Sequence, residues 1–172
     1  MDCKTQERQL LKFLVTSAAF FFIGTVHGVA QVIRPIRAWL DSIGSPYGGP
    51  GHMIDPLAHA HMNVIGGVSL LLMAASYFMF LRITKQTLYS GKLLEHSFWW
   101  TSIGLIGFYS TLMIFGIWEG NLLLSEGAAA AEAAHRYYGP VISTVATIMG
   151  IGFWVFFANV FLTYKKVKNY RD

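Results

Sequence analysis

Cysteine and charge are both scarce in this sequence, and each scarcity excludes a class of protein. Cys3 is the one cysteine among 172 residues, so a single chain forms no disulfide, no cysteine-ligated iron–sulfur cluster and no cysteine-based zinc site. Charged residues make up 13% of the chain, whereas 54% is hydrophobic and 15% aromatic. A soluble domain carries about twice that share of charge. The composition therefore predicts a membrane protein whose redox chemistry, where present, uses histidine.

Long apolar runs are abundant, and four of them cover most of the chain. They lie near residues 11–33, 57–81, 98–118 and 141–164. About 20 apolar residues suffice for a helix to cross a bilayer core of roughly 30 Å. The first run is too long for the apolar part of a cleavable signal peptide and lacks a small-x-small cleavage pattern, so we expect it to remain. These runs predict an all-α membrane protein, one four-transmembrane-helix bundle occupying residues 1–172.

The basic residues are distributed unevenly between the two sides of these spans. One side carries Lys4, Arg8, Lys12, Arg82, Lys85, Lys92, Lys165, Lys166, Lys168 and Arg171. The other side carries Arg34, Arg37 and Arg136. Because cytoplasmic loops hold the excess of lysine and arginine, we expect both termini to be cytoplasmic. The net charge of +4 is then a topology signal, and no nucleic-acid partner is expected.

Histidines gather toward the outer ends of the predicted spans. His59 and His61 stand just inside the second span, His27 lies near the end of the first, and His135 precedes the fourth. Ionisable residues at membrane depth are candidate functional sites. Helical neighbours two residues apart point about 200° from each other, so His59 and His61 do not bind the same metal ion. The residues alone leave two interpretations open, which are haem or metal ligation and simple hydrogen bonding near the interface.

A family resemblance favours haem. The segment from Leu57 through Ser76-Tyr77-Phe78 to Arg82 resembles the second transmembrane helix of haem–copper oxidase subunit I, in the branch of C-family cytochrome oxidases and bacterial nitric oxide reductases. In that family a histidine ligand of low-spin haem b stands before a Ser/Thr/Ala-Tyr-Tyr/Phe element, at the offset that separates His59 from Ser76. Segments 98–120 and 138–163 are similar to the third and fourth helices. The resemblance covers nearly the whole chain but only the first third of that subunit, so we expect a redox carrier and not a complete oxidase or nitric oxide reductase.

The resemblance also implies how a short chain could complete a site. The family's helices form three arcs of four around a pseudo-threefold axis, and its tenth helix carries a His-x-His whose imidazoles serve different haems. His59-Ala60-His61 resembles this pattern. We therefore expect a homotrimer with haem b at each subunit boundary, ligated by His59 of one copy and His61 of the next. His27 and His135 are the alternative ligands for a site within one bundle.

Other polar residues have expected roles around such a haem. Asn63 and Gln31 are candidates to orient the ligating imidazoles. Arg34, Arg37 and Arg136 are candidates to bind the haem propionates, because arginine pairs bidentately with carboxylates. A solvated loop face is the equally open interpretation of these arginines.

The sequence predicts a haem b protein that transfers electrons near the outer face of a bacterial or archaeal cytoplasmic membrane. Iron with two histidine ligands has no open position, which favours electron transfer over gas chemistry. A membrane quinol or a respiratory-chain protein is the expected partner. Three alternatives remain open: a gas-binding or gas-reducing haem protein, a non-catalytic subunit of a respiratory oxidase, and a copper or other metal transporter using His27, His59 and His135.

Overall fold

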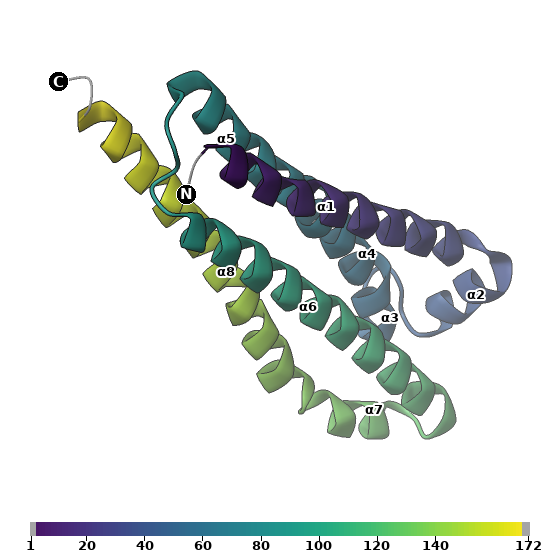
Figure 1. The fold of residues 1–172 in the computed structure, drawn as a ribbon. Coiled ribbons are helices and arrows are strands. Elements are labelled where there is room, and N and C mark those ends of the chain that lie inside the picture. The colour runs from purple at the N-terminus through teal and green to yellow at the C-terminus, as the bar shows by residue number, and fades with distance from the viewer. Residues whose placement is uncertain (1–2, 170–172) are drawn as a thin grey trace.

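In a computed structural model, which describes residues 3–169, the chain folds into long helices that run side by side (Figure 1). No strand occurs within this described part. The elements in chain order are α1 (Cys3–Val32), α2 (Arg34–Ser42), α3 (Gly49–His52), η1 (Met53–Ala58), α4 (His59–His61), η2 (Met62–Ser69), α5 (Leu70–Thr84), α6 (Gly91–Ser125), α7 (Ala128–His135) and α8 (Tyr138–Asn169).

Four stretches of helix are long and apolar enough to cross a membrane. They are Cys3–Val32, Gly49–Thr84, Gly91–Ser125 and Tyr138–Asn169. Each contains one of the four predicted runs, except that the first run includes one residue beyond α1. This residue, Ile33, has an extended backbone and separates α1 from α2. The prediction of an all-α, four-span membrane protein is therefore confirmed. A short helix, α7, lies between the last two spans.

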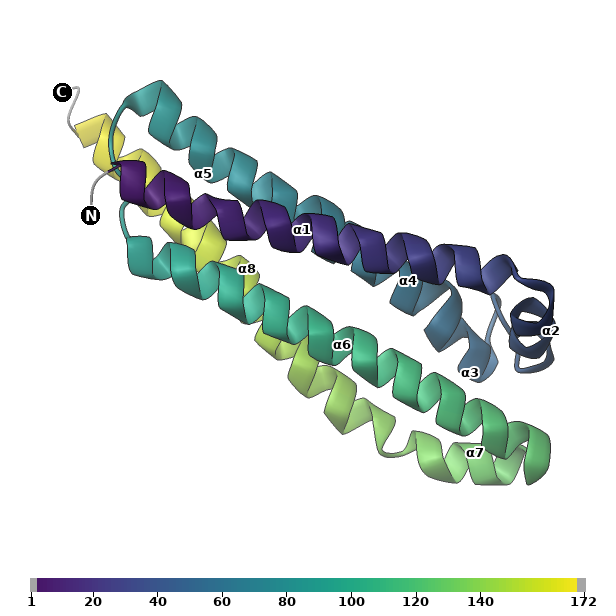
Figure 2. The same ribbon diagram turned by 45° about the vertical axis from the view of Figure 1, so that its right-hand side comes forward.

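The two termini lie at the same end of the bundle, while α2, α3 and α7 lie at the other (Figures 1 and 2). We call these the terminal end and the α7 end. Which end faces the cytoplasm stays a prediction from the charge distribution. Arg171, which contributes to that prediction, lies outside the described residues.

The second span is not a uniform α-helix. Two π-helical segments, η1 and η2, flank the single turn α4. Pro56, inside η1, has no N–H to donate to the helix, and Asp55 before it has non-helical backbone angles. Such wide turns are rare and occur mainly at functional sites. In this chain they enclose His59 and His61.

Small residues bring α6 and α8 into close contact. A Cβ added to Gly104 would lie 2.4 Å from the backbone nitrogen of Met149, and one added to Gly152 would lie 2.4 Å from that of Thr101. Small residues thus allow these two spans to approach closely. A Cβ added to Gly150 of α8 would meet only Trp154, at 3.9 Å.

A hydrophobic core toward the terminal end joins α1, α5 and α6. Tyr77, from the Ser-Tyr-Phe element, is fully buried, packs edge-on against Phe13 of α1 and contacts the Ser97 hydroxyl of α6 at 3.3 Å. Phe13 in turn contacts Phe98, with ring centroids 4.9 Å apart. This tyrosine therefore has a structural role in connecting three spans.

Buried polar side chains also hold the connection between α5 and α6. Asn159 of α8 accepts from the Ser90 backbone N–H at 3.1 Å and donates to the Ser90 carbonyl at 3.0 Å. The Gln6 amide oxygen accepts from the Leu88 N–H at 2.8 Å. Because unpaired polar groups are costly in hydrocarbon, these pairings explain how amides are accommodated in spans α1 and α8.

Candidate histidine site

His59 lies against α1, where Gly28 makes room for its imidazole. Its Nδ1 is 3.0 Å from the carbonyl oxygen of Gly24, and a Cβ on Gly28 would lie 2.6 Å from its Cε1. Asn63, one turn later, donates from Nδ2 to the His59 carbonyl at 3.1 Å. The imidazole is therefore positioned by two helices, its own and α1.

His61 faces a different helix. Its ring lies against Phe108 of α6, with centroids 4.5 Å apart and planes tilted by 34°. Its Nδ1 is 2.8 Å from the carbonyl oxygen of Leu57. The two histidines thus contact α1 and α6 respectively, as their spacing predicted.

These contacts determine which ring nitrogen carries the proton. A carbonyl oxygen only accepts hydrogen bonds, so Nδ1–H donates in His61. Nδ1 of His59 lies 3.0 Å from the Gly24 carbonyl oxygen and 3.2 Å from the Asn63 amide nitrogen, which has the His59 carbonyl as its nearer acceptor, so we assign the proton to Nδ1 here too. The lone pair of each neutral imidazole then resides on Nε2. For His59 that atom has at most a long contact with the Asn63 amide, at 3.5 Å. An imidazole whose Nδ1–H is held by a carbonyl is oriented for metal ligation through Nε2.

His27 has the opposite arrangement. The Gln31 amide N–H donates to its Nε2 at 3.1 Å, so its proton is on Nδ1, which lies 3.2 Å from the Tyr109 hydroxyl. Gln31 also donates to the Ile54 carbonyl, at 3.3 Å. His27 is buried, and its ring stands perpendicular to that of His59 with centroids 5.9 Å apart. It borders the histidine pair, but its Nε2 lone pair is already in use.

A groove of about 490 Å³ reaches His27 from the side of α2 and α6. Gln31, Trp39 and Ile54 contribute to its walls. His27 therefore borders an opening in the bundle that is large enough for part of a small molecule.

His135 lies elsewhere in the molecule. Its Nδ1 is 3.0 Å from an oxygen of the buried Glu119 carboxylate, and its ring stacks on Tyr138. Glu119 is about 15 Å further along α6 than Tyr109, the partner of His27, given a rise of 1.5 Å per residue. The three histidines of the metal-transport alternative are thus not gathered, and the described part of the chain contains no group of three or more His, Cys, Asp or Glu that could hold an ion.

The three arginines expected near propionates have different surroundings. Arg37 is engaged, with ion pairs to Asp41 and Asp55, each at 2.6 Å, and a hydrogen bond to the Ser45 hydroxyl at 2.8 Å. The bonds to Asp41 and Asp55 raise the pKa of its guanidinium above the usual value. This cluster ties α2 to the start of the second span.

Arg34 and Arg136 are exposed. Arg136 donates to the Ala133 carbonyl at 2.8 Å and lies over the Tyr137 ring. The two contacts of Arg136 leave most of its N–H donors available, as does the exposed position of Arg34. In Arg37, by contrast, all three guanidinium nitrogens donate hydrogen bonds.

Sequence reasoning found the imidazoles but missed several of their partners. Asn63 and Gln31 were expected as orienting residues and do contact His59 and His27. Tyr109 and the Gly24 carbonyl were not expected. A hydroxyl within an apolar span was the available signal for Tyr109, whereas a backbone carbonyl leaves no trace in the residue types.

The fold and the site define a multi-pass integral membrane protein with a pair of positioned imidazoles in its second span. No family model matches the chain. It is similar to cbb3-type cytochrome c oxidase subunit CcoN1 of Stutzerimonas stutzeri, with 24% identity over 119 residues, 68% of this chain and 23% of that protein.

Two further bacterial proteins are similar over a longer stretch. The bacteroid cytochrome c oxidase subunit 1 homolog of Bradyrhizobium diazoefficiens is 24% identical over 88% of this chain and 29% of its own length. The cytochrome c oxidase subunit 1 homolog of Azorhizobium caulinodans is 23% identical over 93% of this chain and 29% of its own. The chain thus spans less than a third of the relatives it matches. It is a relative of haem–copper oxidase subunit I, as the resemblance implied.

Proposed function

We propose that this protein binds haem b through His59 and His61 and transfers electrons within the membrane. The observation that carries the proposal is the matched state of the two imidazoles. His59 donates Nδ1–H to the Gly24 carbonyl, and His61 donates Nδ1–H to the Leu57 carbonyl. The Nε2 lone pair of each imidazole is then available to bind a metal ion. Similarity to cytochrome c oxidase subunits supports haem iron as that metal ion.

The residues present fit the group. Neutral imidazole oriented by a second hydrogen bond is the ligand that low-spin haem takes, and iron held by two such imidazoles has no open position and passes single electrons. The chain itself fixes each ring by packing against Gly28 or Phe108 and keeps its proton on Nδ1. Arg34 and Arg136 are the arginines with donors available for propionates.

The proposed assembly is a homotrimer in which His59 of one copy and His61 of the next serve the same haem. Two observations support this over a site within one chain. The imidazoles face different helices, so one ion does not reach both. His27, whose ring centroid lies 5.9 Å from that of His59, has its Nε2 lone pair bonded to Gln31, which disfavours it as the second ligand.

The proposed physiological role is that of a carrier near the outer face of a bacterial membrane. A membrane quinol or a respiratory-chain protein would supply the electrons. The position of the histidine pair toward the α7 end, away from the basic terminal end, supports a site in the outer half of the bilayer.

Optical spectra of purified variants test the assignment. His59→Ala and His61→Ala should each abolish the low-spin haem absorbance, and His96→Ala, which removes an exposed histidine at the terminal end, should leave it intact. Unchanged absorbance in either site variant would exclude shared ligation. Loss in His59→Ala alone would move the second ligand to His27 or His135 of the same chain.

A further inference from the structure

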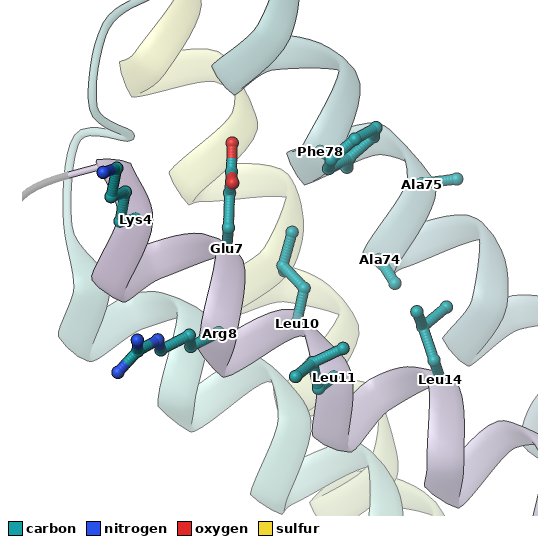
Figure 3. A pocket seen from close by; sticks show the side chains of 9 residues that line it. All are labelled: Lys4, Glu7, Arg8, Leu10, Leu11, Leu14, Ala74, Ala75 and Phe78. Atoms are coloured by element: carbon teal, nitrogen blue, oxygen red, sulfur yellow. The ribbon is translucent and has the colours of Figure 1, made fainter.

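A second groove lies at the terminal end of the bundle, whereas the histidine pair lies toward the α7 end. It is a groove of about 660 Å³ between the first half of α1 and α5 (Figure 3). Its apolar walls come from Leu10, Leu11, Leu14, Ala74, Ala75 and Phe78. The two adjacent alanines of α5 are small, which leaves the space that a larger side chain would fill.

Two cationic side chains stand at the end of this groove. Lys4 and Arg8 line it, are exposed, and are four residues apart on α1, so they share one face of the helix. Within residues 3–169, no carboxylate forms an ion pair with either of them. Lys12, the next cation along α1, is paired with Glu95.

The one carboxylate that lines the groove is already neutralised. Glu7 forms an ion pair with Arg82 of α5, with Nε and Oε1 3.3 Å apart. Arg82 also lies over the Phe78 ring, 5.0 Å from its centroid. The groove therefore has a net positive end, formed by both helices, and an apolar remainder.

We infer that this groove binds one anionic phospholipid from the leaflet at the terminal end. The phosphate pairs with Lys4 and Arg8, and an acyl chain lies along the apolar walls toward Leu14, about 9 Å further along α1. Charge complementarity selects the occupant, because a cationic pocket between membrane helices favours anionic over zwitterionic headgroups. A zwitterionic lipid brings its own ammonium group to the same cations and loses this advantage.

Lipid retention by the purified full-length protein tests the inference. The protein is incubated with mixed vesicles of equal parts phosphatidylglycerol and phosphatidylcholine, re-isolated, and examined by native mass spectrometry for lipid that stays bound. The parent should retain phosphatidylglycerol in preference. The K4Q/R8Q double variant should lose that preference by about tenfold, since each basic residue near an anionic surface contributes a several-fold attraction.

Two further variants separate the groove from general surface charge. K165Q/K168Q removes the same charge from exposed positions on α8 at the same end and should behave as the parent. A75F fills the groove without a change of charge and should reduce retention. Equal retention of both lipids by the parent, parent-like behaviour of K4Q/R8Q or A75F, or an equal loss in K165Q/K168Q would each overturn the inference.

Discussion

Gly28 of α1 and His59 of α4 approach so closely that no other residue fits at position 28 without moving the imidazole. A Cβ there would lie 2.6 Å from Cε1 and 3.2 Å from Nδ1 of His59. Gly28→Ala should therefore displace the ring and break its bond to the Gly24 carbonyl. Because residues that orient a ligand contribute 10- to 100-fold to metal affinity, we expect haem binding to weaken by at least about tenfold, measured by haem titration of the purified protein.

Gly150→Ala is the matched control, since its nearest neighbour is 3.9 Å away. It should bind haem as the parent does. Parent-like affinity in Gly28→Ala would show that the contact with α1 does not position the ligand.

Tyr109 and His27 form a pair that borders the proposed haem ligand His59. Tyr109→Phe removes the hydroxyl 3.2 Å from Nδ1 of His27 and should lower the free energy of unfolding by about 1 kcal/mol, because a partly buried donor loses its acceptor. The low-spin absorbance should not change. Thermal unfolding and an optical spectrum of the same sample measure the two effects, and an altered spectrum would indicate that His27 reaches the iron.

Arg37 holds the α7 end together through Asp55. Arg37→Gln should lower the free energy of unfolding by about 1 kcal/mol, since screening limits the value of a partly exposed ion pair. In haem-free protein, Arg34→Gln removes the same charge from an exposed neighbour and should leave the free energy of unfolding unchanged. Thermal unfolding at low and high salt distinguishes them, because the difference should shrink as salt increases. Equal stability of the two variants would contradict an ion-pair role.

Sharing of one haem between copies makes a prediction about mixed assemblies. When His59→Ala and His61→Ala chains are co-expressed, some subunit boundaries pair an intact His61 with an intact His59. Haem absorbance should then return, although each variant alone lacks it. Failure of the mixture to recover absorbance would place both ligands within one chain.

Much of the fold follows from the sequence because hydrocarbon imposes strict requirements. A span must be long, apolar and helical, so the runs at 57–81 and 98–118 identify their helices, whose ends extend beyond these runs. The opposite directions of His59 and His61 follow equally from helical geometry. A family relationship that the Ser76 offset indicated is supported by the bacterial relatives.

The backbone distortion and the hydrogen-bond partners at the site depend on contacts between segments that are distant in the sequence. The π-helical turns around α4 depend on how Pro56 and the packing against α1 and α6 distort the backbone, which residue types alone do not specify. The Gly24 carbonyl and the engagement of Arg37 by Asp55 are contacts between distant segments. Side-chain patterns therefore identified the candidate imidazoles, whereas their tautomers depended on tertiary contacts.

Electron paramagnetic resonance of the oxidised, purified parent protein tests the central proposal most directly, because the spectrum reports the axial ligands of ferric haem. Ligation by His59 and His61 predicts a low-spin ferric signal of the type given by two imidazole ligands. A high-spin signal, or protein that contains no haem after expression with haem supplied, would contradict it.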